Sequence, residues 1–326
     1  MAKVLDWLRG GTFKLLSLAV GIFLLWGTLA PLETLLWWIS QDEDQRDANN
    51  SSPNPSSGTS SEADTASDIN CYVVFLPGVG SYDADNLTEE ESNFVDRVIE
   101  DHPNCVSVRD VFPYSAANQG LVGDRILAPL WDAISQSDGL AYTAINIRNI
   151  WRMALSADPR YGPVYNRGTA SAIVDRMNAA HSLPSANRRI NVIVMSTSGG
   201  AQVAVAAVPY LDDWLNAQVV AISIGGVFAG RDGFDQAAGV YHLYGTEDWI
   251  DDIGRIIFPS RWRWVVGSPF NRARREGRYQ AIETRPHEHD GDRGYFGEET
   301  VRNGIKYIDL TLEELNALPI WLIDDH

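Results

Sequence analysis

The sequence predicts an α/β domain with a mostly parallel β-sheet and helices on both faces. Two observations predict this class. Short apolar runs rich in β-branched and aromatic residues recur along 70–326, and segments with helical spacing separate them. Strands that alternate with helices need crossover connections, which produce parallel pairing. The expected strands are 71–76, 105–112, 190–195, 219–224, 240–244 and 279–284.

Helices are expected between and after these strands. The segment 86–102 is the first, and Thr88 and Glu91 have the spacing of a capping box just inside its start. A break is expected near Pro159, because proline cannot continue a helix. The other expected helices are 126–134, 142–180 with that break, 201–215 and 299–308.

Composition excludes several classes of protein. The 326 residues are 45% hydrophobic and 21% charged, an ordinary globular balance. With 26 basic against 43 acidic residues the formal charge is −17, so we expect no nucleic-acid partner, because phosphate binding needs Lys and Arg. Two cysteines are too few for a disulfide-rich scaffold or a thiolate zinc site.

Residues 1–40 are expected to be a membrane anchor. The segment 15–32 carries no charge and would form about 27 Å of helix, close to the thickness of a bilayer core. Basic residues precede it and two tryptophans follow it, which predicts a single-pass orientation with the N-terminus in the cytoplasm and the rest of the chain outside. A signal peptide cleaved after 28–30 is the alternative, although the apolar stretch is longer than usual for one.

Residues 41–69 are expected to be a flexible linker between the anchor and a single domain at 70–326. The segment is rich in Ser and Pro and has seven acidic residues against Arg46. It has too little apolar surface to offset the entropy of ordering. A flexible chain of this length spans about 30 Å, so the linker would act as a tether.

The strongest chemical signal is the segment Ser196-Thr197-Ser198-Gly199-Gly200. It follows an apolar strand and begins an alanine-rich helix. This is the spacing of a nucleophile elbow, G-x-S-x-G, with serine in the first glycine position. Such a turn exposes the central serine beside a helix N-terminus, which favours a developing anion. A plain glycine-rich turn is the alternative, and a phosphate loop would lack its lysine.

A serine nucleophile needs a base and an acid that orients the base. Among the six histidines, only His287 and His289 follow a late expected strand, and His289 is the preferred base of the two. Asp248 comes just after the strand at 240–244, with Glu247 as the substitute. The resulting chain order is serine, aspartate, histidine.

With this order the sequence resembles the α/β-hydrolase family over 70–326, closest to its lipase and esterase branch and to membrane-anchored bacterial hydrolases. The segment 245–248 resembles the family's acid turn, 289–296 its histidine loop, and 76–80 its oxyanion loop. The resemblance implies oxyanion amides at Val79 and Gly199 and substrate contacts at Gly78, Gly80 and Tyr295. This chain departs from the family at Ser196 and in lacking the first two strands.

The resemblance implies a serine hydrolase that cleaves carboxylic esters, of lipids or other acyl compounds. Ser198 would be the nucleophile, His289 the base and Asp248 the acid, with no cofactor and no metal. Thioesterase, peptidase and acyltransferase activity stay open. A non-catalytic binding or scaffold protein with the same fold is the second hypothesis, because fold alone does not decide function.

Residues 255–278 carry seven arginines against Glu276 alone, with aromatic residues between them. One interpretation is a surface that contacts anionic lipid headgroups. The other is a solvated strand and loop with ordinary core tryptophans. The excess length at 113–187 has two interpretations as well, a partial cap over the site or a thicker core.

Cys71 and Cys105 each begin an expected strand. If these strands are neighbours, both cysteines lie at the same end of the sheet, where a disulfide or two reduced buried thiols would both fit. The acidic and histidine-rich segment 287–292 also admits a metal site, but adjacent ligands rarely share one ion.

Overall fold

The computed structural model describes residues 69–83, 87–115, 118, 140–185, 187–301 and 304–321. All of them belong to one compact unit, Ala63–His326. The expected anchor, nearly all of the expected linker and the expected helix at 126–134 lie outside the described residues and stay predictions. Of the helices that are described, none has the length and apolar character that crossing a membrane requires.

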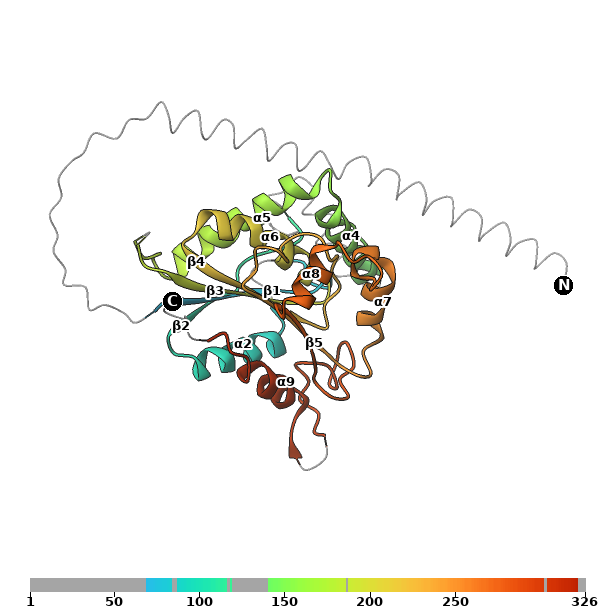
Figure 1. The fold of residues 1–326 in the computed structure, drawn as a ribbon. Helices are drawn as coiled ribbons and strands as arrows, with labels where there is room; N and C mark the ends of the chain where they lie inside the picture. The colour runs from blue at the N-terminus through green and yellow to red at the C-terminus, as the bar shows by residue number, and fades with distance from the viewer. Residues whose placement is uncertain are drawn as a thin grey trace, which may run out of the picture. The chain divides into compact units, whose positions relative to one another are not determined.

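The described strands form one six-stranded sheet in the order β2-β1-β3-β4-β5-β6, and each neighbouring pair is parallel (Figure 1). This confirms the expected parallel α/β class. The second strand is shorter than the expected 105–112, because the chain turns away from the sheet after Val108. The strands are β1 (Cys71–Leu76), β2 (Cys105–Val108), β3 (Ile190–Thr197), β4 (Ala217–Ile224), β5 (Gly239–Tyr244) and β6 (Tyr279–Glu283).

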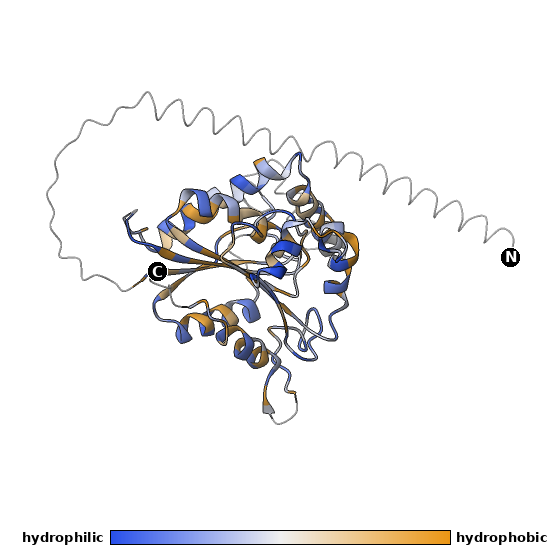
Figure 2. Cartoon of the chain, viewed as in Figure 1, coloured by the Kyte–Doolittle hydropathy of each residue, from blue (hydrophilic) through white to orange (hydrophobic). Residues whose placement is uncertain are grey.

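Helices cover both faces of the sheet, because alternate residues of each buried strand point to opposite sides. On β1, Tyr72, Val74 and Leu76 pack with α5, α6 and α8, whereas Cys71, Val73 and Phe75 pack with α2 and α9. Figure 2 shows the strands as predominantly apolar. The helices are α2 (Glu89–Asp101), α4 (Leu140–Ala157), α5 (Gly162–Ala180), α6 (Gly200–Trp214), α7 (Trp249–Ile257), α8 (Pro269–Arg275) and α9 (Tyr307–Asn316), with a 3-10 turn η1 (Pro259–Arg261).

Two local predictions are confirmed. The Thr88 hydroxyl accepts a hydrogen bond from the Glu91 amide at the start of α2, and the Glu91 carboxylate accepts one from the Thr88 amide, which is a complete capping box. The long helix expected at 142–180 is divided into α4 and α5, and Asp158 and Pro159 lie in the break. Because α5 packs on the sheet, this part of 113–187 thickens the core.

The closing helix expected at 299–308 is wrong. The structure places α9 over Tyr307–Asn316, and Gly304 has a φ of 79°, a left-handed conformation that cannot continue a helix. Apolar residues of the later segment determine the register, because Ile308, Leu312 and Leu315 pack into the core. Neither α7 nor α8 was expected from the sequence.

Cys71 and Cys105 form a disulfide. They are directly paired in the parallel register of β1 and β2, so both side chains point to the same face at the same end of the sheet. The disulfide closes a loop across 34 residues that contains α2. It therefore restricts the unfolded chain around the first strand-helix-strand unit.

We expect Cys71→Ala/Cys105→Ala to lower the free energy of unfolding by about 2–4 kcal/mol, because the unfolded chain regains the freedom of this loop. Urea unfolding followed by circular dichroism measures the change. Reduction of the wild type should produce the same loss, and reductant should leave the double variant unaffected. Equal stability of the oxidised wild type and the variant would contradict the expectation.

Candidate active site

The site lies where the strand order reverses. From β1 the chain first moves outward to β2 and then returns to the other side of β1 as β3. The loops after β1 and β3 therefore diverge, and parallel sheets bind ligands in the crevice that this leaves at the carboxyl ends of the strands. Ser198 follows β3, and Gly78 and Val79 follow β1.

Ser198 sits in a strained turn between β3 and α6. Its φ is 47°, a left-handed conformation that costs a residue with a side chain about 1–3 kcal/mol. A Cβ at Gly200 would lie 2.6 Å from the Pro77 carbonyl oxygen, so only glycine fits against the end of β1. Ser196 fits the position normally held by glycine because its hydroxyl donates to the Ile222 carbonyl of β4, at 3.0 Å.

Ser198, His289 and Asp248 come together from three separate loops. Nε2 of His289 lies 3.0 Å from Oγ of Ser198. Nδ1 of the same ring lies 3.0 Å and 2.9 Å from the two carboxylate oxygens of Asp248. The histidine side chain is 13% exposed and the aspartate side chain is fully buried. This is the geometry of a serine, a base and an orienting acid.

His287, the other candidate for the base, lies elsewhere. It is fully buried, and its Nε2 contacts the Tyr307 carbonyl at 3.0 Å. Its ring stacks on Tyr295, with centroids 5.1 Å apart. Burial lowers the pKa of His287 despite its contacts with backbone carbonyls, so the ring is neutral at pH 7. It supports the histidine loop and does not touch Ser198.

The buried carboxylate of Asp248 is saturated with hydrogen bonds. Besides the His289 ring, it accepts the amide of Ile250 at 2.9 Å, which caps the start of α7, and the hydroxyl of Tyr295 at 2.8 Å. The Gly245 amide in turn donates to that hydroxyl at 2.7 Å. A buried carboxylate needs this many donors, because an unpaired one is costly to desolvate.

Tyr295 corrects a sequence expectation. It was expected to contact substrate, but it is 4% exposed and its hydroxyl donates to Asp248. Burial and the neighbouring carboxylate raise the pKa of Tyr295, so the hydroxyl keeps its proton and remains a donor. Tyr295 is thus placed to hold the acid, and a single tyrosine in a loop carries no sequence signal for this position.

The two residues expected to supply oxyanion amides, Val79 and Gly199, lie beside each other at the Ser198 turn. A Cβ at Gly199 would lie 2.5 Å from a methyl carbon of Val79, so the two residues are in contact. A Cβ at Gly78 would lie 3.2 Å from the Cβ of Ser198, which places the loop after β1 directly over the serine. Within the described residues, neither the Val79 amide nor the Gly199 amide donates a hydrogen bond. Gly80 lies in the same turn, which the Ser81 amide closes by donating to the Gly78 carbonyl.

Asn149 of α4 holds this loop in place. Its side-chain amide donates to the Val79 carbonyl at 2.8 Å and to the Ser81 carbonyl at 2.6 Å, and the residue is fully buried. Arg148 beside it donates to Asn149 and to the Tyr114 carbonyl. Sequence analysis missed Asn149, because α4 carries several other polar residues and nothing in their pattern singles this one out.

A second serine-histidine-aspartate set lies in the core. Ser223 contacts Nδ1 of His242 at 3.0 Å, and Nε2 of that ring contacts Asp251 at 2.7 Å. These residues are at most 2% exposed, so no substrate reaches them. The set joins β4, β5 and α7, and Asp251 also pairs with Arg255. Its role is to fix α7, at whose first turn Asp248 lies.

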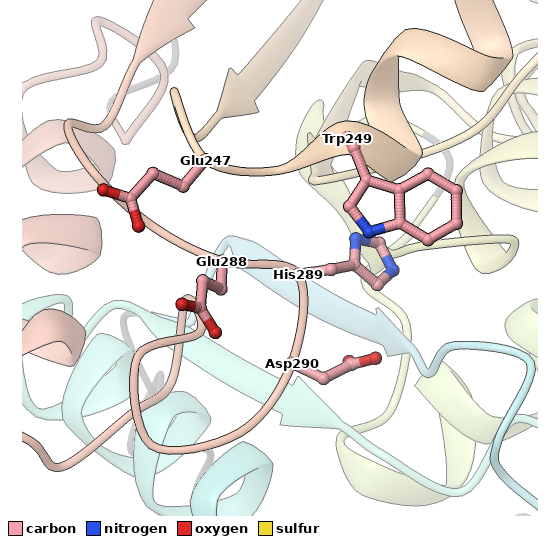
Figure 3. A pocket seen from close by; sticks show the side chains of 5 residues that line it. All are labelled: Glu247, Trp249, Glu288, His289 and Asp290. Atoms are coloured by element: carbon pink, nitrogen blue, oxygen red, sulfur yellow. The ribbon is translucent and has the colours of Figure 1, made fainter.

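A pocket of about 320 Å³ opens beside the histidine of the site (Figure 3). Trp249 forms its aromatic wall next to the His289 ring. Its lining residues are Glu247, Trp249, Glu288, His289 and Asp290. Arg293 pairs with Glu247 and Glu288, so two of the three carboxylates are neutralised. Within the described part of the chain, no group of His, Cys, Asp or Glu side chains is arranged to hold a metal ion.

We expect kcat/KM for an ester to fall at low pH with a midpoint above 6.5. Burial lowers the pKa of His289, but the hydrogen bond and charge of Asp248, with the charges of Asp290 and Asp251, outweigh it and raise the pKa. The protonated ring cannot accept the Ser198 proton, so activity is lost as pH falls through this pKa. A pH profile of kcat/KM measures the midpoint, and one below 6.5 would contradict the expectation.

We expect Tyr295→Phe to lower kcat about tenfold. The Asp248 carboxylate loses a charge-assisted hydrogen bond that fixes its position, and the orientation of the imidazole is then less well fixed. Without the tyrosine hydroxyl, the negative charge of Asp248 stabilises the protonated His289 ring more strongly and raises its pKa further. The acid limb of the pH profile should therefore move to higher pH. Tyr307→Phe is the matched control, since its hydroxyl contacts Arg293 and not Asp248. A similar effect of both variants would indicate a general packing role for Tyr295.

No family model and no curated protein sequence matches the chain. Among solved structures, the chain is similar to a dienelactone hydrolase-like promiscuous phosphotriesterase from metagenomic libraries, with 9% identity and a TM-score of 0.42 over 76% of this chain and 84% of that one. The parallel sheet of this chain, with its strained serine turn after β3, fits the α/β-hydrolase superfamily that the sequence resembles.

Proposed function

We propose that this protein is a serine hydrolase that cleaves carboxylic esters through an acyl-enzyme. One observation carries the proposal. The His289 ring contacts the Ser198 hydroxyl with one nitrogen and the buried Asp248 carboxylate with the other. In this arrangement the aspartate fixes the tautomer that leaves Nε2 free to accept a proton.

Acylation begins when His289 takes the Ser198 proton and Oγ attacks the ester carbonyl carbon. The carbonyl oxygen becomes an anion, and we propose that the amides of Val79 and Gly199, two residues in contact beside Ser198, donate to it. The protonated ring then gives its proton to the leaving alkoxide, which departs as the alcohol. The acyl group stays on Ser198 as an ester.

Deacylation repeats these steps with water. His289 takes a proton from water, the hydroxide attacks the acyl carbon, and the same two amides hold the second oxyanion. Collapse of this intermediate breaks the bond to Ser198, and the histidine returns the proton to the serine oxygen. The products are the free acid, the alcohol and the unchanged enzyme.

The proposed substrate and location rest on the sequence alone. An anchor at 15–32 and a tether at 41–69 would hold the catalytic domain beside the outer face of a membrane. We propose lipid or other acyl esters as substrates, because lipids would be close to such a domain. The protein is thus proposed to be a membrane-anchored esterase whose catalytic domain lies outside the cytoplasm.

A fluorophosphonate probe tests the nucleophile, because it reacts covalently with an activated serine. We expect the full-length wild type to be labelled and Ser198→Ala to show no labelling and at least about 10⁴-fold lower kcat with a short-chain ester. In-gel fluorescence measures labelling, and a panel of acyl esters, thioesters and peptides then identifies the substrate class.

Ser185→Ala is the matched control. Ser185 is exposed in the segment before β3, at the opposite end of that strand from Ser198, so its removal should leave labelling at the wild-type level. A folded wild type that is not labelled would contradict catalysis and favour the scaffold hypothesis. Labelling that persists in Ser198→Ala would assign the nucleophile to another residue.

A further inference from the structure

An apolar surface extends outward from the wall of the pocket beside His289. We call it the rim surface, and it consists of Trp249, Ile256, Ile257, Trp264 and Val266. All five are at least half exposed, and Trp264 reaches 73%. Large apolar side chains that gather on one exposed surface indicate an interaction site, whereas scattered ones do not.

Helix α7 presents the rim surface because its polarity is reversed. A surface helix normally buries its apolar residues. In α7 the buried residues are Asp251 and Gly254, and Asp251 is held inside by His242 and Arg255. With the inner face occupied in this way, Ile256 and Ile257 are left in solvent.

Contacts through Trp262 link the end of α7 to the segment that carries Trp264. The Trp262 indole donates to the carbonyls of Arg255 and Ile256 at the end of α7, and its ring packs on Trp264 at 5.0 Å. The Arg275 side chain donates to the Val266 carbonyl at 3.0 Å. The Val265 amide donates to the Trp262 carbonyl, so the segment 262–266 and the end of α7 are joined through Trp262. Trp249, at the start of α7, lines the pocket.

The basic residues beside the rim surface lack acidic partners. Arg263, Arg274 and Arg275 are exposed, and among the described residues no carboxylate pairs with them. By contrast, Arg272 and Arg278 in the same segment each form an ion pair. Three unpaired guanidinium groups on a chain with a formal charge of −17 indicate an anionic partner at this position.

We propose that the rim surface docks on a bilayer that carries anionic phospholipids, so that Ser198 receives its ester from the membrane. Isoleucine and tryptophan side chains enter the boundary between headgroups and acyl chains, and arginines pair with the phosphates. The expected tether at 41–69 keeps a bilayer within about 30 Å. The substrate part of this inference rests on the proposed function.

A fluorescent label at the rim surface tests docking without any need for catalysis. The two native cysteines form a disulfide, so Trp264→Cys introduces the sole free thiol for an environment-sensitive dye. The full chain is reconstituted in phosphatidylcholine vesicles with or without about 30% phosphatidylglycerol. We expect the emission to shift to shorter wavelength only with the anionic lipid, and to return in about 0.5 M salt, where screening is short-ranged.

Trp214→Cys is the matched control for the label. Trp214 is also exposed, but it lies at the end of α6 opposite Ser198, so its dye should report water in both vesicles. No shift at position 264 would overturn the proposal. A shift in detergent that increases with protein concentration would overturn it as well, because it would assign the surface to a second copy of the chain.

Two further variants test delivery of the substrate. Both variants should lower hydrolysis of a long-chain ester dissolved in anionic vesicles about tenfold or more. The double variant Ile256→Ser/Ile257→Ser loses apolar burial in the membrane. The double variant Arg263→Gln/Arg274→Gln loses charge that pairs with the phosphates. Hydrolysis of a water-soluble acetate ester should stay unchanged. An equal loss with both substrates would overturn the role of the rim surface in delivering the substrate. A wild type that is inactive on both substrates would contradict the proposed function, but the dye result on membrane docking would still hold.

Discussion

The buried carboxylate of Asp248 is the point on which the arrangement of the site depends. It receives hydrogen bonds from the histidine loop, from Tyr295 and from the first turn of α7. Two segments, one that follows β5 and one that follows β6, are thus held together by one charge. Because a carboxylate in this position is costly unless every donor is present, the loops are tied to a single arrangement.

The same carboxylate joins the reaction centre to the outer surface. Asp248 caps α7, and one turn later Asp251 fixes that helix to β5 through His242. Asp251 and Gly254 occupy the inner side of α7, and Ile256 and Ile257 at its end are exposed. The acid of the site and part of the rim surface therefore belong to one short helix, which two buried aspartates position.

Sequence reasoning succeeded where local pattern and burial agree. The apolar runs of β1 and β3 predicted both strands, and the small residues around Ser198 predicted the turn that its positive φ requires. It failed where buried polar groups determine the structure. Helix α7 buries Asp251 and exposes two isoleucines, and Asn149 and Tyr295 act through hydrogen bonds to residues far away in the sequence. Helix α9 was placed too early for a different reason, because its apolar residues determine its register. The choice between His287 and His289 also needed three-dimensional contacts.

The backbone of Ser198 has an implication for how this sequence can change. A glycine at this position would adopt the left-handed conformation without cost, so selection for folding alone would favour replacing the serine. Under the proposed function, the residue marks a compromise between stability and activity. A protein descended from this one that no longer used the nucleophile would gain stability from Ser198→Gly, so loss of the activity would be recognisable from this one residue.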